Sequence, residues 1–482
     1  MERAEARAIF RQGEQACVEV LLRFARLEER LGELVAENGA LRERVAALEE
    51  RLGQNSRNSS LPPSQDPPSV PPRPRKPASE SRRGGQPGHE GRHRPLLELE
   101  RVDELVEHWP ERCAHCAREL SEEERLDAAP PQRHQLYELP PIAVTVTEHR
   151  LHRVRCSVCA RETRAELPAE VAGSAFGPRL QAAVATLAVR NRVSRRDTVE
   201  LVGELFGCRL ASGTIDAIVQ RAGEALAEPQ ARLSEHVRSA PAVNIDETGW
   251  RLRGGKRTLW GALSERAALF RIAPDRHERE ARALLGEGFA GVVCSDRWWA
   301  YNYLEPERRQ VCWAHIIRDF TAQSEGLEPE QSFGEAGLQI AGRLFQAWDD
   351  FQRDGDRARL LERVAPLKPE LKALLERYAG KSAKYKRTRG LARNLLKIWP
   401  ALWTFSEIEG VEPTNNRAER GLRGAVIYRK LSLGSQSETG ERTIERLLSA
   451  SQTCRLQRRS LFAYLADLLT ATARGDPAPS LV

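Results

Sequence analysis

Two short, mostly apolar runs that each lead into an aspartate constrain the fold of this chain most. Val243–Ile245 precedes Asp246, and Gly291–Ser295 precedes Asp296. Runs of this length are typical of strands buried in a sheet, and ligands of open α/β sheets bind at strand ends. An aspartate at a strand end can also cap the following loop, but two such ends in one α/β pattern favour a shared site. We therefore predict a sheet that holds carboxylates at the tips of two strands.

Glu247 adjoins Asp246, and the residues alone do not choose between the two acids. Successive side chains of a strand point to opposite faces. Only one of the two carboxylates can therefore readily face a shared metal ion, and both alternatives stay open at this point.

A third acid, Glu419, lies far downstream on a helical pattern. It follows Asn416 at the spacing of a capping box and precedes Arg423 at the spacing of an ion pair on a helix surface. Glu419 also shares a helix face with Leu422 and Val426, where a carboxylate is costly unless it is paired or bound to a metal ion. The pattern therefore leaves a structural and a catalytic role open.

Three carboxylates from separate elements suit the chemistry of phosphates. Carboxylates bind Mg²⁺, and paired Mg²⁺ ions stabilise the attacking and leaving oxygens of phosphoryl transfer. The chain has a net charge of +7, with seven Lys/Arg against two Glu in residues 71–95 and ten Lys/Arg against four Glu in residues 415–459. Each basic run alone is equally typical of a solvated surface. Together with the acids, the charge indicates nucleic acid as the substrate.

Four of the nine cysteines form two CxxC pairs, Cys113 with Cys116 and Cys156 with Cys159. Two such pairs are typical of a tetrahedral zinc site, and the β-rich segment Ile142–Val154 between them predicts a zinc ribbon. A redox pair or unrelated thiols are the alternatives. The odd cysteine count, the charged N-terminus and the absence of a run of about 18 apolar residues predict a cytoplasmic protein without a membrane span.

Residues 17–52 carry a heptad pattern in which Asn38 is the one polar seam residue. The two seam rows are Val20, Leu27, Leu34, Leu41 and Leu48, and Cys17, Phe24, Leu31, Asn38, Val45 and Leu52. Such a narrow stripe predicts a coiled coil, in which a lone Asn can fix the register and a two-stranded state. We expect a homodimer formed through this segment. An amphipathic helix packed on its own domain is the alternative.

These patterns predict a multidomain α+β protein. Its expected segments are a coiled coil or leucine zipper (1–55), a basic Pro/Gly-rich linker that is extended or disordered (56–100), a zinc ribbon (101–170), a helical, helix-turn-helix-like DNA-binding domain (171–238), an α/β catalytic domain in two parts (239–320 and 406–475) around an all-helical insertion (321–405), and a tail (476–482). Strands are expected at 242–246, 257–263, 267–272, 292–295 and 310–313. Helices are expected at 199–206, at 212–222 with Ser212 as its cap, at 277–285 and at 298–304.

The chain resembles the DDE transposases of the insertion sequence 66 family over nearly its whole length. The residues that carry the resemblance are the N-terminal zipper, Asn58–Ser64, Gly84–Gly91, the two CxxC pairs, Asp246–Thr248, Ser295-Asp296, Cys312–His315 and Asn415–Arg420. The resemblance implies an RNase H-like fold interrupted by a helical insertion. It also implies that Asp246, rather than Glu247, joins Asp296 and Glu419 in a metal-binding triad.

Cys312 and His315 resemble a CxxH signature that follows the second acid in several DDE transposase groups. An ordinary strand end with a histidine that caps the next helix is the alternative.

The implied activity is cleavage at the ends of an insertion sequence and transfer of the cut strand to target DNA, with two Mg²⁺ ions per active site and a structural Zn²⁺. Basic residues expected to contact DNA phosphates are Arg82, Arg83, Arg420, Arg423, Arg429 and Lys430, the last four being equally compatible with a solvated helix face. Expected partners are the terminal inverted repeats, target DNA, a second copy of the chain and helper proteins encoded by the element, within a bacterial nucleoid. The alternatives are a non-catalytic DNA-binding regulator and an RNase H-like nuclease that does not join strands.

Overall fold

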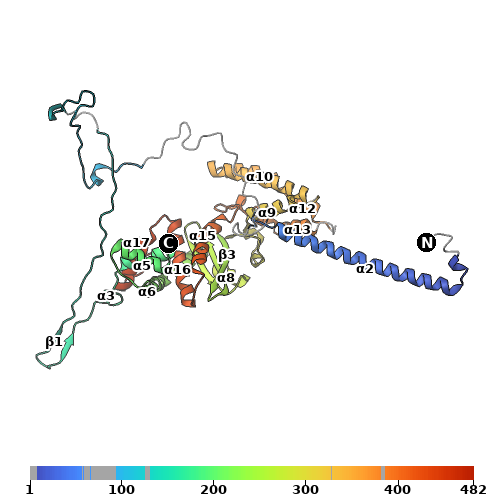
Figure 1. The fold of residues 1–482 in the computed structure, drawn as a ribbon, viewed down its shortest axis with the longest axis horizontal. Helices are drawn as coiled ribbons and strands as arrows, with labels where there is room; N and C mark the ends of the chain where they lie inside the picture. Colours follow the sequence, from blue (N-terminus) through green and yellow to red (C-terminus); the bar gives the residue numbers. More distant parts are fainter. Residues whose placement is uncertain are drawn as a thin grey trace. The chain divides into compact units, whose positions relative to one another are not determined.

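The computed structural model describes residues 8–56, 58, 66, 94–124, 131–326, 328–380 and 386–482, and Figure 1 labels some of their elements. The chain divides into two units. The first comprises Met1–Val70, His149–Glu200 and Leu210–Val482, and the second comprises Pro71–Glu148 and Leu201–Arg209. Most of the expected linker, including Arg82 and Arg83, lies outside the described residues. Within the described part of the chain, no helix is long and apolar enough to cross a membrane.

The first unit contains a mixed sheet of five strands in the order β5-β4-β3-β6-β7. The strands are β3 (Ala242–Leu252), β4 (Gly255–Leu263), β5 (Ala268–Ala273), β6 (Val292–Ser295) and β7 (Arg309–Val311). The first three form an antiparallel meander, whereas β6 and β7 run parallel to β3. β6 has the predicted bounds. β3 is longer than predicted because the chain turns at Arg253 and Gly254, both with positive φ, and such a two-residue turn joins twisted strands directly.

Side chains of α16 (Glu438–Leu456) protect the edge strand β5. Backbone N–H groups at every second residue of β5 donate to side chains spaced one helical turn apart on α16. The pairs are Ala268 to Thr453 Oγ1 (3.0 Å), Phe270 to Ser449 Oγ (2.9 Å), and Ile272 to the Glu445 carboxylate. An open strand edge is a template for pairing with another chain. These bonds therefore protect the edge of the sheet formed by β5. The site described below lies at the other half of the sheet, where β3 neighbours β6.

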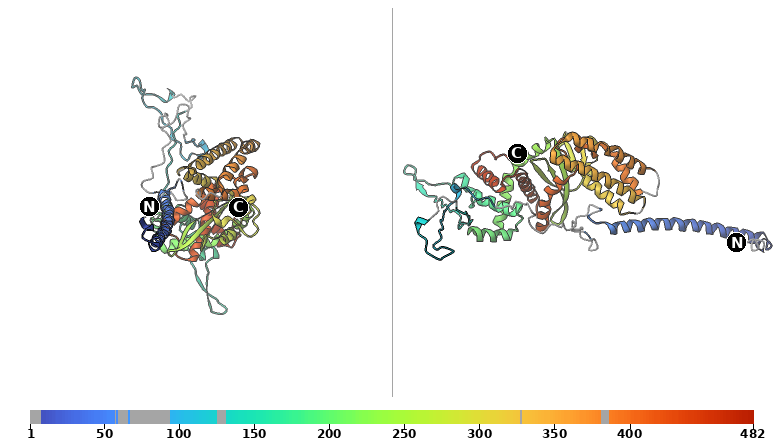
Figure 2. Two further views of the ribbon diagram at one scale, coloured as in Figure 1. Left: turned by 90° about the vertical axis from the view of Figure 1, so that its right-hand side faces the viewer. Right: turned by 90° about the horizontal axis from the view of Figure 1, so that it is seen from above.

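A helical bundle with its own hydrophobic core follows β7 and is drawn in yellow to orange in Figure 2. Its helices are α9 (Trp313–Ser324), α10 (Glu330–Asp354), α11 (Arg357–Val364), α12 (Leu367–Tyr378), α13 (Lys386–Lys397) and α14 (Thr404–Glu407). The segment expected as an insertion is therefore helical, but its first helix begins earlier than predicted. Trp313 opens α9 instead of ending a strand, since its buried indole donates to Leu402 O at 2.8 Å within the bundle.

Helices α9 and α10 approach so closely that Gly334 leaves no room for a side chain. A Cβ atom there would lie 2.2 Å from Ser324 N and 2.5 Å from Phe320 O. We expect Gly334→Ala to lower the free energy of unfolding by about 1–3 kcal/mol. The control Gly342→Ala, on the same helix with open space around it, should raise it by up to about 1 kcal/mol. Thermal melting compares the two variants, and equal melting temperatures would contradict this close approach.

Apart from the N-terminal helix described below, the remaining helices of at least eight residues lie in sequence before the sheet, after it or between two of its strands. They are α4 (Pro178–Ala185), α5 (Arg195–Phe206), α6 (Ser212–Ala225), α7 (Ala227–Arg238), α8 (Glu278–Leu285), α15 (Asn416–Ser432) and α17 (Leu461–Arg474). Ser212 is the first residue of α6 rather than its cap, and Ala211 occupies the cap position. The helix expected at 298–304 is only a 3₁₀ turn, Trp299–Tyr301. Because α5 crosses the boundary between the units, the helix-turn-helix stays a prediction.

The heptad segment forms α2 (Glu14–Gly53), one helix of 40 residues. Its described seam side chains lie at the surface, with Phe24 43%, Leu27 58%, Leu34 48% and Leu41 55% exposed. The helix is therefore confirmed, whereas pairing of two such helices stays a prediction.

The expected zinc ribbon has fewer strands than predicted. β1 (Arg153–Arg155) pairs antiparallel with β2 (Glu162–Arg164), but residues 142–152 are described without any strand. The prediction of strands there was wrong. Val146 is 83% exposed, so the alternating pattern lies against no core, and alternation without a neighbouring strand does not specify a sheet.

Candidate active site

Asp246 and Asp296 lie at equivalent positions in the register of two neighbouring parallel strands. The last paired residues of β3 and β6 are Asn244 and Cys294, and each aspartate follows two positions later. Asp296 comes directly after its strand, as predicted. Asp246 does not end its strand, because β4 continues to cover the other edge and pairs Gly261 with Asp246. The prediction that each aspartate ends a strand was therefore wrong for Asp246. The pairing of β3 with β6 nevertheless ends just before Asp246, so the two acids occupy equivalent positions on the two strands.

A buried arginine holds the loop that carries Asp296. Arg309 is 2% exposed, and it donates to Asp296 O at 2.6 Å and to Ser295 Oγ at 3.1 Å. Burial lowers the pKa of Arg309 to about 10 despite the nearby Asp296. The Asp296 Oδ1 in turn accepts a hydrogen bond from Trp298 N at 2.8 Å. Sequence reasoning missed Arg309, whose one signal is a charge directly before the predicted strand 310–313.

Asn415 fixes the helix that carries Glu419 against β3. Its Nδ2 donates to Ile245 O at 2.7 Å, and its Oδ1 accepts from Asn244 Nδ2 at 3.0 Å. All of these groups are buried, so the bonds are made away from water, where an unpaired amide is costly. They place the first turn of α15 beside Asp246. Sequence reasoning also missed this role of Asn415.

Glu419 has neither of the two structural partners that its spacing suggested. Asn415 precedes α15 without a capping bond from its side chain. In the described part of the chain, the Glu419 carboxylate pairs with Arg318 Nη2 at 3.8 Å and is 39% exposed. The capping box with Asn416 and the pair with Arg423 are therefore not formed, and the carboxylate is held near the sheet.

The acids act on one another electrostatically. Burial raises the pKa of Asp246 well above its ordinary value, and the charges of Glu247, Asp296 and Glu419 raise it further. A divalent cation bound by these carboxylates would relieve their mutual repulsion.

Glu247 lies on the opposite face of β3 and has its own partners. Its carboxylate accepts a hydrogen bond from Tyr301 and pairs with Arg276. Arg276 also lies 4.2 Å from the centre of the Trp298 ring. Burial raises the pKa of Glu247, and Asp296 adds to this shift. Glu247 thus anchors the loop after Asp296, whereas the charge of Glu419 acts on Asp246.

A hollow of about 800 Å³ opens beside Asp296. Its cationic lining residues are Arg297, Arg318, Lys386 and Arg387. Arg297 donates to Asn394 Oδ1 at 2.7 Å, which links the Asp296 loop to α13. The helical insertion therefore supplies one wall of the space next to Asp296, and that wall carries the acids Asp319 and Glu325 as well as cationic side chains.

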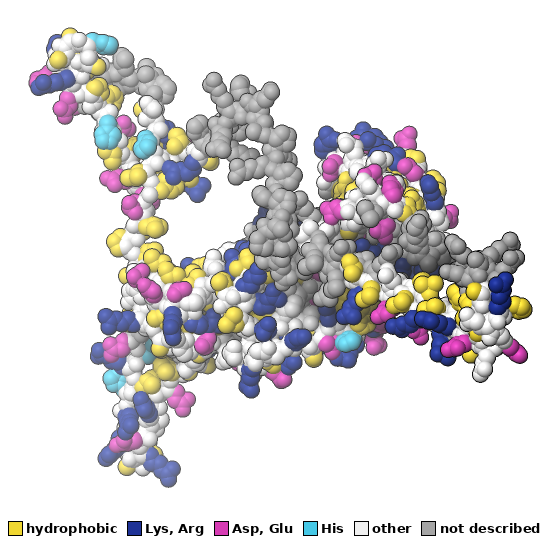
Figure 3. Space-filling model, turned by 45° about the vertical axis from the view of Figure 1, so that its right-hand side comes forward, with side chains coloured by type: hydrophobic (Ala, Val, Ile, Leu, Met, Phe, Trp, Pro, Cys, Tyr) yellow, Lys and Arg dark blue, Asp and Glu magenta, His cyan; other side chains and the backbone are white. Residues whose placement is uncertain are grey.

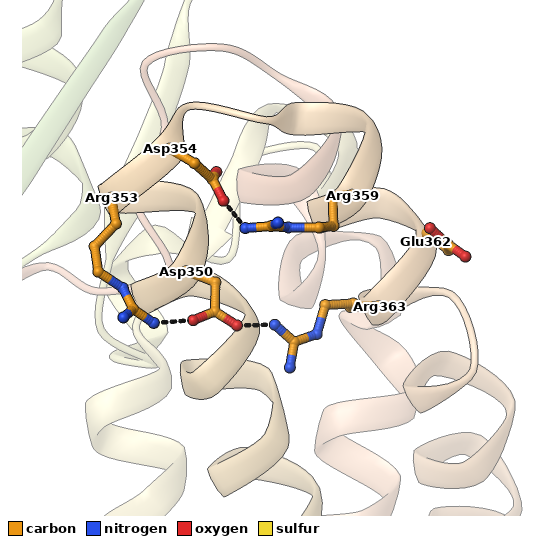
Figure 4. A pocket seen from close by; sticks show the side chains of 6 residues that line it. All are labelled: Asp350, Arg353, Asp354, Arg359, Glu362 and Arg363. Carbon is orange, nitrogen blue, oxygen red and sulfur yellow. Dashed lines mark hydrogen bonds and ion pairs between the residues drawn. The ribbon is translucent and has the colours of Figure 1, made fainter.

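A second hollow, of about 670 Å³, lies within the insertion (Figure 4). Its six lining residues are Asp350, Arg353, Asp354, Arg359, Glu362 and Arg363. Asp350 pairs with both Arg353 and Arg363, and Asp354 pairs with Arg359. Because these charges largely neutralise one another and no acid from the sheet takes part, this hollow is not a candidate for the chemistry.

The basic residues expected to contact DNA differ in their surroundings. Arg420, Arg423 and Lys430 are exposed on α15. Arg429 is partly occupied, since its Nη1 donates to Gly249 O and to Thr248 Oγ1. Figure 3 shows Lys and Arg side chains spread over one face and interspersed with acidic ones. Arg420 Nε also donates to Asn416 O at 3.2 Å, so both Arg420 and Arg429 are partly occupied.

The two CxxC segments form the same turn. Ala117 N donates to Cys113 O and Ala160 N donates to Cys156 O, both at 2.9 Å, and both alanines have positive φ. Backbone N–H groups of His115 and Cys116 lower the pKa of Cys113. Those of Cys159 and Val158 lower the pKa of Cys156. Each turn therefore favours thiolates, the form that binds metal, but the two turns belong to different units.

These features define an α/β protein with an acidic site. Its mixed sheet carries two aspartates in register, and a helix docked on the sheet carries the glutamate. The chain belongs to the transposase IS66 family, which matches residues 173–443 and so includes all three acids. Residues 2–95 match a family of unknown function, DUF6444.

Two curated proteins of Sinorhizobium fredii are similar to the chain, and both are uncharacterized. Protein y4jD is 29% identical over 302 residues, which are 56% of this chain and 58% of that protein. Protein y4qI is 29% identical over 209 residues, which are 40% of this chain and 38% of that protein. The chain thus spans about half the length of these relatives.

Proposed function

We propose that this chain cleaves DNA at the ends of an insertion sequence and transfers the cut strand to target DNA. The observation that supports the proposal is the register of Asp246 and Asp296 on parallel strands, together with the bonds by which Asn415 docks the helix that carries Glu419 against β3. The membership of the transposase IS66 family gives DNA as the substrate. The order of the sheet, with an antiparallel meander followed by two parallel strands, supports an RNase H-like fold.

The residues fit a pair of Mg²⁺ ions. Asp246, Asp296 and Glu419 offer oxygen ligands, and burial, followed by the charges of Glu247, Asp296 and Glu419, raises the pKa of Asp246. Bound Mg²⁺ would activate water and then the 3′-hydroxyl, and would stabilise the oxygens that attack and leave in line. Arg309 keeps the Asp296 backbone in place. Arg318 and Lys386 line the adjoining hollow, where they would hold phosphates of the DNA.

We further propose that two chains pair through α2. An exposed apolar stripe that runs along a helix is costly in water unless a partner covers it. A second α2 offers the same stripe and the same Asn38, so the pairing would bring two DNA ends together. Helper proteins and nucleoid association stay predictions.

The test of the catalytic proposal uses the purified full chain and a DNA fragment that carries the sequences flanking the gene. Inverted repeats close outside the gene would mark the element ends. With Mg²⁺ we expect a cut at the repeat that leaves a 3′-hydroxyl, and with EDTA we expect binding without a cut. A protein that binds the repeats but never cuts them in Mg²⁺ or Mn²⁺ would instead be a regulator.

Zinc should be structural, held by Cys113, Cys116, Cys156 and Cys159, which would together offer four ligands and no open position. We expect about one Zn²⁺ per chain at this site, loss of that ion in Cys156→Ser, and unfolding confined to residues 101–165. Cys208→Ser, outside both pairs, is the control and should keep its zinc. Metal analysis and limited proteolysis check this, and full zinc retention by Cys156→Ser would reject the assignment.

A further inference from the structure

The junction between β7 and α9 places a thiol and an imidazole next to Glu419. Cys312 N donates to Ser295 O at 2.9 Å, and Cys312 Sγ accepts from Asn415 N at 3.1 Å. Cys312 is therefore bonded both to the strand that leads to Asp296 and to the residue that docks α15. His315 follows in the first turn of α9, with its N–H donating to Cys312 O at 3.1 Å.

These side chains form a compact set of metal-ligand atoms. The Cys312 Sγ, one ring nitrogen of His315 and a Glu419 carboxylate oxygen all lie within 4.8 Å of one another. Among the described residues, this is the one set of three or more Cys, His, Asp or Glu side chains at such spacing. Cys312 and His315 lie together at the start of α9, and the fold brings Glu419 of α15 to them.

Two further observations concern the polar atoms of the cluster. The His315 Nδ1 is buried and has no hydrogen-bond partner in the described structure. The Arg318 Nη2 lies 3.1 Å from His315 Nε2 and 3.8 Å from Glu419 Oε1. A single positively charged nitrogen thus lies near both the imidazole and the carboxylate, where a bound cation would also be attracted.

We propose that Cys312, His315 and Glu419 form a site for a transition-metal ion of the Zn²⁺ class. Thiolate and imidazole ligands favour such ions over Mg²⁺, which prefers oxygen. Three protein ligands leave a fourth position open. Binding converts the Cys312 thiol to a thiolate and releases one proton to solvent. The proposal rests on the proposed function in one respect, because Glu419 would serve both this ion and the catalytic Mg²⁺, so that the two metals compete.

The test is a titration of the full chain with Co²⁺, which reports a bond to thiolate by near-ultraviolet charge-transfer absorption. The absorption due to Cys312 is the difference between the absorption of the wild type and that of Cys312→Ser. Cys294→Ser is the matched control, since Cys294 is also buried but lies outside the set. We expect Cys294→Ser to keep the full signal, and His315→Ala to bind Co²⁺ at this site at least ~10-fold more weakly.

Arg318→Met should have the opposite effect, because it removes the positive charge that competes with the ion, and the Cys312-dependent signal should then appear at lower Co²⁺. Circular dichroism confirms that each variant is folded. Identical titrations of wild type and a folded Cys312→Ser would overturn the site. Mg²⁺-dependent cleavage is measured in parallel. If cleavage depends on Glu419 but no Cys312-dependent signal appears, only the site formed by Cys312, His315 and Glu419 is rejected. If the signal appears but the protein does not cleave DNA, only the proposed function is rejected.

Discussion

Glu419→Ala is expected to bind the element ends like the wild type and to leave them uncut. The same result is expected for Asp246→Ala and Asp296→Ala, because the three carboxylates share one electrostatic field and would hold the metal ions as a set. Loss of a ligand that supports metal catalysis removes several kcal/mol of transition-state stabilisation, so cleavage should fall by roughly 10³-fold or more. Gel shift measures end binding, and single-turnover cleavage of a labelled end measures the rate.

Glu412→Ala is the control for these variants. Glu412 lies shortly before α15 and pairs with Arg417 at 2.9 Å, so it shares the acidic character and the neighbourhood without facing the sheet acids. We expect its cleavage rate to stay within a few-fold of wild type. A folded Glu419→Ala protein that cut at nearly the wild-type rate would remove Glu419 from the active site.

Breaking α2 with Leu34→Pro and Leu41→Pro should leave binding to a single DNA end intact and prevent complexes with two ends. Each proline removes a helix hydrogen bond and costs roughly 3 kcal/mol or more in a helix interior. Both leucines belong to the exposed seam, at 48% and 55% exposure. Light scattering should show the change from dimer to monomer, and gel shift with two differently labelled ends should show the loss of pairing.

Glu14→Pro is the matched control because it places a proline at the first residue of the same helix, where the missing N–H is tolerated. It should remain dimeric. A double-proline variant that stayed dimeric and still paired ends would mean that α2 packs on its own chain and that dimerisation uses another surface.

The sequence predicted the strands of the site well because short apolar runs bounded by turns are a local signal. It placed β6 and Asp296 correctly. It ended β3 too early at Asp246, since the length of a strand depends on which neighbours pair with it. β4 continues to pair along β3 after β6 has ended. The sequence signal for this pairing is the hairpin turn at Arg253 and Gly254, which lies several residues after Asp246.

The supporting residues of the site could not be predicted from spacing. Asn415 acts through bonds to residues 170 and 171 positions away, and Arg309 acts through the backbone of the Asp296 loop. Neither role leaves a periodic pattern. The choice between Asp246 and Glu247 likewise depended on partners, because Tyr301 and Arg276 engage the Glu247 carboxylate.

The most direct measurement is the joining of a labelled element end to a target plasmid by the purified chain in Mg²⁺, with the junctions read by sequencing. We expect a new phosphodiester bond between the 3′-oxygen of the element end and the target strand, absent with Asp246→Ala, Asp296→Ala or Glu419→Ala and retained with Glu412→Ala. Cut ends that never join to the plasmid under any metal condition would contradict strand transfer and leave a nuclease.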